Sequence, residues 1–366
     1  MTRQPTGSNQ ARTAGVTTGT ASPDRARLRL GMIGAGRFAH LYHFPAALAD
    51  PRAEVTIVCD PAPSPHTERF ANELGVPIVS DMEDVLAAGV CDAVVISTPH
   101  TLHAGQIRAA LRAGRHVLVD KPYVMRSAEA VELTALAARR GLIGSVAFNQ
   151  RFSTAWSRAR AIVQAGELGT IRRVETIQLG GAWVAAADGN APRTTGPLRP
   201  AWYLDPKQSG GGVLIGRGAH MADIVPWVIG RRPERLRAKV SAGKRGAVDN
   251  GGTADIDYGD FTWRFTTIAD RGRLWDDARF YGTSGRIEIS KPEGTLGFWD
   301  MSREDLEGHR LDVPDPGIDG VALTDFLDAL DGGAEPRCTF DEAWPSVRIL
   351  EAIYESSKAG GTWVTL

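Results

Sequence analysis

Between residues 28 and 148, short apolar runs alternate with segments of helical pattern, and this alternation constrains the fold more than any other feature of the chain. The runs lack the polar–apolar alternation of strands that face water on one side, so both faces of each strand should be buried. Buried strands separated by helices predict a parallel sheet covered on both faces, which is a doubly wound α/β fold. The predicted strands are residues 28–33, 54–59, 77–79, 93–97, 116–119 and 144–148, and the predicted helices are residues 38–48, 67–74, 82–88, 102–113 and 127–140, the last one capped by Ser127.

A glycine-rich turn joins the first predicted strand to the first predicted helix, and residues 34–39 read GAGRFA. The first glycine permits a tight turn, and the second lets the backbone approach a pyrophosphate. The free N–H groups at the start of the helix can bind the phosphates. We therefore expect a Rossmann domain in which Gly34, Gly36, Arg37 and Phe38 contact a dinucleotide. A glycine turn in an α/β domain without a cofactor is the alternative.

An acidic residue, Asp60, ends the second predicted strand, 21 residues beyond the turn. A carboxylate at this position can accept hydrogen bonds from the hydroxyls of the adenosine ribose. It would also repel a 2′-phosphate, and residues 61–63 supply no arginine to neutralise one. The sequence therefore predicts NAD as the cofactor and makes NADP the less favoured choice.

A lysine, Lys121, directly follows the apolar strand at residues 116–119, and Pro122 restricts the backbone after it. The carboxyl end of a strand in an open α/β sheet lies at the crevice where such sheets bind ligands. If the glycine turn holds a dinucleotide, Lys121 is therefore a candidate for contact with the group that reacts. A surface lysine in a strand-to-helix turn is the alternative.

The pattern changes after residue 150, where strands begin to follow one another without intervening helices. This change predicts an α+β second domain with a largely antiparallel open sheet. We expect a disordered tail at residues 1–26, the dinucleotide-binding domain at 27–149, and a domain for substrate binding and oligomerisation at 150–366. The second domain should have strands at 171–179, 236–240, 261–267, 278–281 and 287–289, helices at 154–165, 321–330 and 343–358, a long loop at 180–200, and a helix from the triple glycine 210–212 to residue 228.

The composition excludes several functional classes. Basic and acidic residues nearly balance at a net charge of -1, which gives no basic footprint of the kind that binds nucleic acid. No apolar run reaches the roughly 20 residues needed to cross a bilayer. The three cysteines, Cys59, Cys91 and Cys338, have no paired spacing, so neither a disulfide framework nor a metal site is expected. A cytoplasmic protein without nucleic-acid or membrane partners fits these features.

Taken together and in order, these landmarks resemble the glucose–fructose oxidoreductase and inositol dehydrogenase family (Gfo/Idh/MocA). The resemblance extends from about Arg27 to Leu366 and rests on the order and spacing of many segments. They are the glycine turn, Ser97-Thr98-Pro99 with His103, residues 114–122 ending in Asp120-Lys121-Pro122, Asn149-Gln150-Arg151-Phe152, Trp202-Tyr203 before Asp205-Pro206, the triple glycine leading to Gly218-Ala219-His220, and the closing Asp325-Phe326 and Ala352-Ile353-Tyr354.

The resemblance implies a two-domain oxidoreductase that holds its substrate between the nicotinamide and the open sheet. It implies that Lys121 contacts the substrate hydroxyl or carbonyl and that His220 is the second catalytic residue. Family members commonly pair through the open sheet, so a homodimer or homotetramer is expected. We assign Ser97, Thr98, His103, Asp120 and Lys121 to cofactor binding with the glycine turn. We assign Trp202 and Tyr203 to the substrate, because their rings could stack on a sugar; packing in the core or at an interface is the alternative.

The chain departs from the family pattern at several positions near this site. Gly216 occupies the position of the family's aspartate, one helical turn before His220, so no carboxylate is available there. Arg217 follows where the family usually has an apolar residue, and it could reach the substrate or pair with a surface acid. Asp120 replaces the usual glutamate, and His100 replaces the usual asparagine.

The main functional hypothesis is an NAD(P)-dependent oxidoreductase that transfers a hydride between nicotinamide and a hydroxyl or keto carbon of a sugar, cyclitol or related polyol. A first alternative keeps NAD but has no net redox change, because transient oxidation drives elimination, epimerisation or glycosidic cleavage. The absent carboxylate at Gly216 suggests a second alternative, a non-catalytic NAD-binding protein. The substrate's identity and the direction of the reaction are not encoded in recognisable motifs.

Overall fold

The structure, a computed structural model, describes residues 26–180, 201–243, 248–269, 275–290, 295–300, 309–312 and 320–366. The predicted tail lies outside these residues except for its last residue. The predicted loop, with Trp183, lies outside them except for residue 180. None of the described helices is long and apolar enough to span a membrane.

The first sheet has six strands in the order β3-β2-β1-β4-β5-β6, and every pair of neighbours is parallel. This arrangement confirms the predicted doubly wound Rossmann fold. The residues of β4 are buried without exception, which explains why the sequence of this strand shows no polar alternation. The strands are β1 (Leu28–Ile33), β2 (Ala53–Cys59), β3 (Ile78–Val79), β4 (Ala93–Ile96), β5 (His116–Asp120) and β6 (Gly144–Ala147).

The helices of the first domain also follow the prediction, with one change after the glycine turn. A π-helical turn at Ala39–His43 precedes α1 (Phe44–Ala49), where the sequence predicted one continuous helix. His43, the last residue of the π-turn, contacts Asp120 at the end of β5. The other helices are α2 (Pro65–Leu74), α3 (Met82–Leu86), α4 (His103–Arg112) and α5 (Ser127–Arg140).

The predicted cap of α5 was wrong. Arg126 occupies the N-cap position, and Ser127 is the first residue of the helix. The Ser127 hydroxyl instead donates to Glu351 Oε2 at 2.5 Å, on a helix near the carboxyl terminus. Ser127 therefore serves a long-range contact, which a local capping pattern does not reveal.

The second sheet has nine strands in the order β14-β13-β12-β11-β7-β10-β9-β8-β15, and the pair β7–β10 is parallel within an otherwise antiparallel sheet. The predicted α+β class is therefore confirmed. Four strands were not predicted, namely β9, β13, β14 and β15. The strands are β7 (Ile171–Leu179), β8 (Arg235–Ala242), β9 (Asp249–Asp257), β10 (Thr262–Ile268), β11 (Trp275–Gly282), β12 (Gly285–Ser290), β13 (Thr295–Asp300), β14 (His309–Asp312) and β15 (Val364–Thr365).

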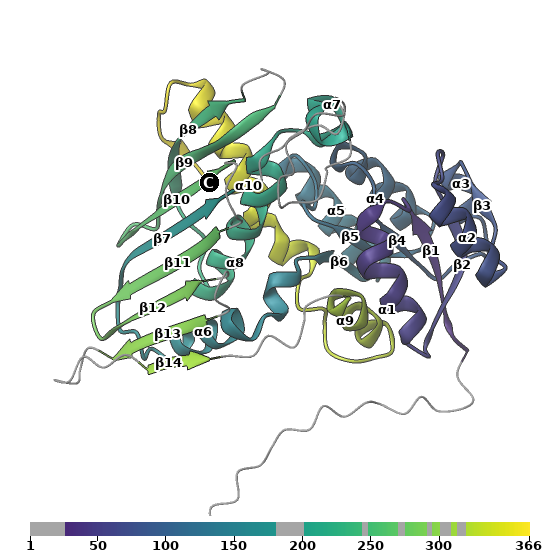
Figure 1. Cartoon of the computed structure of the whole chain (residues 1–366), viewed down its shortest axis with the longest axis horizontal. Coiled ribbons are helices and arrows are strands. Elements are labelled where there is room, and N and C mark those ends of the chain that lie inside the picture. The colour runs from purple at the N-terminus through teal and green to yellow at the C-terminus, as the bar shows by residue number, and fades with distance from the viewer. Residues whose placement is uncertain are drawn as a thin grey trace, which may run out of the picture.

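Helices α6, α8 and α10 pack on one face of this sheet, and α8 and α10 lie between it and the first domain (Figure 1). Helix α9 belongs to the carboxyl-terminal part of the chain, yet Leu323, Phe326 and Leu327 enter the apolar core of the first sheet. The carboxyl-terminal segment therefore contributes to both domains. These helices are α6 (Thr154–Gln164), α7 (Pro206–Ser209), α8 (Ala219–Ile229), α9 (Val321–Leu330) and α10 (Phe340–Lys358).

Candidate active site

A cavity of about 740 Å³ lies at the carboxyl ends of β1, β4 and β5, where the strand order of the first sheet reverses. Open α/β sheets bind ligands at such a switch point. The lining residues come from both domains, because the segment at 202–208 closes one side. Of the residues assigned from the sequence, the lining includes Gly34, Gly36, Arg37, Phe38, Asp60, Ser97, Thr98, Asp120, Lys121, Trp202 and Tyr203.

The glycine turn has the shape that a dinucleotide requires. Gly34 has a φ of +87°, and a Cβ there would lie 2.5 Å from the carbonyl oxygen of Ser97. A side chain at this position would therefore be strained and would collide with the end of β4. A Cβ on Gly36 would meet no atom within 4 Å, so the backbone there borders open space. The turn leaves room for a pyrophosphate where the sequence predicted it.

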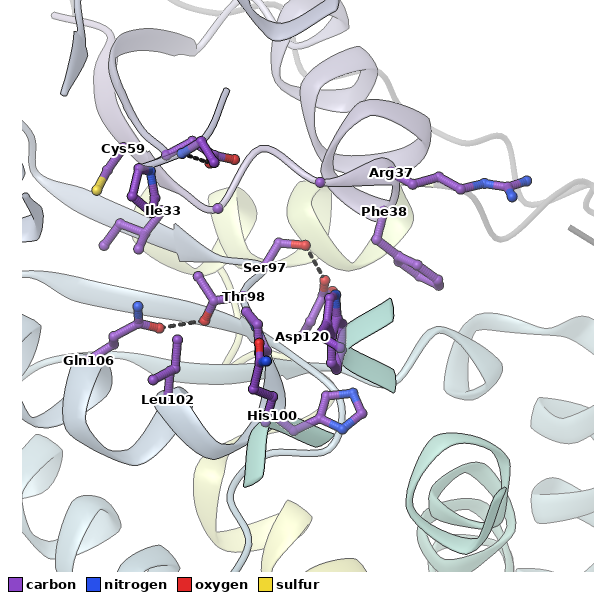
Figure 2. Close-up of a pocket in the computed structure, with 18 of the residues that line it drawn as sticks. Ile33, Arg37, Phe38, Cys59, Ser97, Thr98, His100, Leu102, Gln106 and Asp120 are labelled. Carbon is purple, nitrogen blue, oxygen red and sulfur yellow. Dashed lines mark hydrogen bonds between the residues drawn. The ribbon is translucent and has the colours of Figure 1, made fainter. Parts of the chain in front are cut away.

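The carboxylate of Asp60 is fixed against the glycine turn. Its Oδ2 accepts a hydrogen bond from the backbone N–H of Ala35 at 3.0 Å, and its Oδ1 accepts one from Ala62 at 2.9 Å. The acid therefore faces the cavity at a set position beside the turn. Arg37 is exposed, and its side chain points away from Cys59 and Ser97 (Figure 2).

The carboxylate of Asp120 is held from both sides. His43 Nε2 lies 2.8 Å from Oδ1, and the Ser97 hydroxyl donates to Oδ2 at 2.5 Å (Figure 2). Burial acts to raise the pKa of this carboxyl, but the contacts with His43 and Ser97 outweigh it and hold the pKa below its usual value. Asp120 is therefore an anion with a fixed orientation next to Lys121.

Lys121 reaches from the first domain to the second. Its ammonium donates a hydrogen bond to the carbonyl oxygen of Gly216 at 2.8 Å, and it lies 6.0 Å from the centre of the Phe38 ring. The peptide bond between Lys121 and Pro122 is cis. The structure thus places the ammonium in the cavity wall, against the second domain. Its predicted contact with the reacting group stays a prediction.

The helix that follows the triple glycine is not a continuous α-helix, and this corrects the spacing argument for Gly216. Residues Leu214–Gly218 form a π-helical turn, and α8 begins at Ala219. A π-turn shifts the register of the helix face, so Gly216 and His220 are not stacked one α-helical turn apart. His220 is the second residue of α8 and is half-buried; it does not appear among the described residues that line the cavity.

Arg217 lies away from the cavity, so the structure does not support the predicted contact with substrate. Its guanidinium donates to the carbonyl oxygens of Leu179 and Gly180, both at 2.7 Å, and forms an ion pair with Asp276. Only 6% of the residue is exposed. The predicted alternative of an acidic partner is therefore the one observed, although this partner is a half-buried residue of β11 rather than a surface acid.

His103 was assigned to cofactor binding, but the structure buries it beneath the cavity. Its Nδ1 lies 2.9 Å from the carbonyl oxygen of Pro122, and its Nε2 lies 3.0 Å from that of Thr98. Burial lowers the pKa of the ring, so the neutral form donates to one of these carbonyls at a time. His103 therefore supports the backbone of two segments that line the cavity instead of lining it.

Two histidines that the sequence did not assign lie at the site. His43 contacts Asp120, and His100 lines the cavity beside Trp202 and Tyr203. His43 follows the glycine turn by several residues, and no local spacing links it to Asp120. The substitution of histidine for the family's asparagine at residue 100 was the available signal for the second one.

The described residues contain no group of three or more His, Cys, Asp or Glu side chains that could hold a metal ion. The site instead offers a glycine turn, a fixed acid at the end of β2, and a lysine ammonium on a wall shared by two domains. These are the features of a two-domain, dinucleotide-dependent enzyme.

Comparisons with known proteins name the family. Residues 28–148 match a family model described as an oxidoreductase family with an NAD-binding Rossmann fold, and residues 156–288 match the GFO/IDH/MocA C-terminal domain. The chain therefore belongs to the Gfo/Idh/MocA family of oxidoreductases, which confirms the resemblance found in the sequence.

Two relatives of known name match most of the chain. The rhizopine catabolism protein MocA of Rhizobium meliloti is 27% identical, over 90% of this chain and 95% of its own length. A dTDP-3,4-didehydro-2,6-dideoxy-alpha-D-glucose 3-reductase of Streptomyces violaceoruber is 30% identical, over 73% of this chain and 79% of its own. Among solved structures, the WlbA dehydrogenase of Bordetella pertussis, in complex with NADH and UDP-GlcNAcA, has a TM-score of 0.77 at 21% identity, covering 93% of this chain and 98% of its own.

Proposed function

We propose that this chain is an NAD-dependent oxidoreductase that interconverts a hydroxyl and a keto group on a sugar, cyclitol or related polyol. The observation that carries the proposal is the position of Lys121. Its ammonium stands at the end of β5, on the same cavity as the glycine turn, and is held by a carbonyl of the second domain. A cation there can donate a hydrogen bond to the oxygen of a substrate carbon and stabilise the negative charge that develops on it.

Two side chains share the proton chemistry in this proposal. NAD, when bound, supplies the hydride acceptor or donor at its nicotinamide. In the oxidative direction, His220 takes the proton of the substrate hydroxyl while Lys121 stabilises the alkoxide. The role of His220 rests on its place at the start of α8, next to the π-turn that holds Lys121.

The preference for NAD rests on Asp60. Its carboxylate is fixed by the N–H groups of Ala35 and Ala62, so it cannot swing away from a ligand in the cavity. A fixed anion beside the adenosine ribose accepts hydrogen bonds from ribose hydroxyls and repels a 2′-phosphate. The lining residues next to Asp60, namely Pro61, Ser80 and Met82, are uncharged, and the side chain of Arg37 on the glycine turn points away from Cys59 at the end of β2 (Figure 2).

The substrate class follows from the relatives together with the site. The reductase of Streptomyces violaceoruber is named for a nucleotide-linked deoxysugar, and another relative, from Ensifer adhaerens, is a 1,5-anhydro-D-fructose reductase. In this chain, the stacked rings of Trp202 and Tyr203 line the same cavity as the glycine turn, with centroids 3.9 Å apart. Aromatic faces of this kind pack against the C–H groups of a sugar ring.

A panel of polyols and sugars tests this function. NADH formation is followed with myo-inositol and D-glucose, NADH consumption with 1,5-anhydro-D-fructose, and each is repeated with NADP or NADPH. We expect turnover with at least one member and a preference for NAD. Lys121→Ala and His220→Ala should each lower kcat by more than about tenfold, which corresponds to about 1.4 kcal/mol of transition-state stabilisation. A smaller fall in both variants would refute the catalytic assignment.

We also propose a homodimer or homotetramer that forms through the outer face of the nine-stranded sheet. Four apolar side chains with 36–40% exposure gather at one end of that face, namely Ile177, Leu179, Ile268 and Trp275. Ile268 and Trp275 both lie opposite Leu179 on neighbouring strands, so the patch is continuous. Light scattering with Trp275→Glu tests this proposal, since the substitution should shift the mass toward the monomer.

A further inference from the structure

His100 has a fixed tautomer. It starts the turn at His100–Leu102 directly after β4 and is almost fully buried, with 3% of its surface exposed. Its Nδ1 lies 2.9 Å from the carbonyl oxygen of Ser209, the last residue of α7 in the second domain. A carbonyl can only accept a hydrogen bond, so Nδ1 carries the hydrogen and Nε2 carries a lone pair.

The ring of His100 forms one side of an aromatic corner with Trp202 and Tyr203. It meets Trp202 edge-on with centroids 4.9 Å apart and Tyr203 edge-on at 5.6 Å. All three residues line the cavity, and Figure 2 shows the imidazole on the side of the cavity where Asp120 lies. No hydrogen bond among the described residues uses His100 Nε2. The corner therefore combines aromatic surface with the acceptor nitrogen of His100.

The imidazole stays neutral at ordinary pH. Burial lowers the pKa of His100 well below its usual value, and the nearby ammonium of Lys121 lowers it further. A neutral ring with an acceptor nitrogen suits a hydroxyl, which can donate. It does not suit a carboxylate or a phosphate, which can only accept.

We propose that Nε2 of His100 accepts a hydrogen bond from a hydroxyl group of the substrate, whose ring packs in the aromatic corner. The inference rests on the proposed function and extends it. Lys121 donates to one oxygen of the substrate, and His100 accepts from another. The pair of contacts selects a neutral ring that carries a hydroxyl beside the reacting carbon, and it disfavours a carboxylate at that second position.

Two amide substitutions separate this role from a structural one. In His100→Asn, the amide can replace Nδ1 and still donate to Ser209, but the acceptor at the Nε2 position is lost. In His100→Gln, the longer side chain places an amide near the Nε2 position, and the contact with Ser209 is lost. Both variants and the wild type are loaded with NAD and titrated calorimetrically with myo-inositol and D-glucose. KM is measured for the panel member that the wild type turns over best, and thermal unfolding checks that each variant folds.

We expect His100→Asn to weaken polyol binding about tenfold, the loss of one buried hydrogen bond, and His100→Gln to weaken it less than about threefold. The affinity for NAD should change less than about twofold in both. Monodeoxy analogues of D-glucose identify the hydroxyl that His100 accepts. The analogue without that hydroxyl should bind the wild type as weakly as D-glucose binds His100→Asn. Its affinity should be the same for the wild type and for His100→Asn.

The opposite order, in which His100→Gln binds the polyol more weakly than His100→Asn does, would show that His100 acts by holding α7 and would overturn the proposal. A loss of NAD affinity with unchanged polyol affinity would move the accepted hydroxyl to the cofactor ribose and also overturn it. If the wild type neither binds nor turns over any polyol, the proposed function fails and this inference fails with it. If the wild type turns over a polyol but the variants lack the expected order, this inference alone fails.

Discussion

The two walls of the cavity are built in different ways. On the first-domain wall, side chains at the strand ends hold one another, as Ser97 and His43 hold Asp120. On the second-domain wall, the π-turn presents the backbone carbonyl of Gly216 to Lys121, at the position where the family has a carboxylate. The first wall therefore depends on residue identity, whereas the second depends on backbone path. Substitutions on the first wall should change cofactor binding. Substitutions in the buried ion pair between Arg151 and Asp223, which lies outside both walls, should lower the free energy of unfolding most.

The buried ion pair between the segment that follows the first sheet and α8 should give the largest effect on stability. Arg151, just after the first sheet, pairs with Asp223 of α8 at 2.7 Å, and each side chain is only 1% exposed. Asp223→Ala should lower the free energy of unfolding by about 3–5 kcal/mol, because it leaves a buried guanidinium without that partner. Urea denaturation measures the effect. Asp341→Ala is the matched control, since Asp341 is 71% exposed and its removal should cost under about 1 kcal/mol. Equal losses of stability in the two variants would show that the buried ion pair contributes no more than the exposed one.

The glycine turn offers a sharper comparison within the first wall. Gly34→Ala forces a side chain into a φ of +87° and toward the Ser97 carbonyl, so it should destabilise the protein by about 2 kcal/mol and abolish measurable NAD binding. Gly36→Ala places its Cβ in open space, so stability should change by less than about 1 kcal/mol while NAD binding weakens. Thermal unfolding and fluorescence titration with NAD separate the two outcomes. Unchanged NAD affinity in Gly36→Ala would argue against a dinucleotide at this turn.

The preference between cofactors should respond to Asp60. Asp60→Ser removes the charge that repels a 2′-phosphate, and it replaces the two acceptor oxygens of the carboxylate with one shorter hydroxyl, which accepts more weakly from ribose hydroxyls. We expect the Kd for NAD to rise about tenfold and the Kd for NADP to fall, so that the ratio of the two approaches one or inverts. Titration of both cofactors against wild type and variant measures this ratio. An unchanged ratio would show that Asp60 does not select the cofactor.

The smallest effect concerns the pH dependence of the Asp120 network. The contacts with His43 and Ser97 lower the pKa of Asp120 in the folded state. Its contribution to stability should therefore be present above its unfolded pKa of about 3.9 and be lost as pH falls through the lower folded value. The stability difference between wild type and Asp120→Asn should then shrink below about pH 4. Urea titrations across that range test it, and a difference independent of pH would contradict the assignment.

The sequence predicted the first wall better than the second for a physical reason. The inner strands of the first sheet are largely apolar on both faces, and the bounds of all six strands match the prediction within two residues. Strand β9 was missed because its sequence, DNGGTADID, has the composition of a turn; it is a strand because β8 and β10 pair with it on both sides. The contact of His43 with Asp120 likewise depends on tertiary packing.

The second wall shows the same limit. Whether Arg217 faces substrate or a buried acid depends on where β11 places Asp276, and no local pattern encodes that position. The π-turn at Leu214–Gly218 reads in the sequence as the beginning of an ordinary helix. Local composition therefore identified the lysine and the glycine turn, but not the carbonyl that holds the lysine.

The most direct test of the account measures hydride transfer in a single turnover, with NAD and substrate saturating, for wild type and Lys121→Met. Lys239→Met on β8 is the control, because that lysine is exposed and is not among the described residues that line the cavity. If Lys121 stabilises the charge on the reacting oxygen, hydride transfer should slow by about a hundredfold or more while the Kd for NAD changes by less than about threefold. A rate within about tenfold of wild type, or a loss confined to NAD binding, would contradict the central claim.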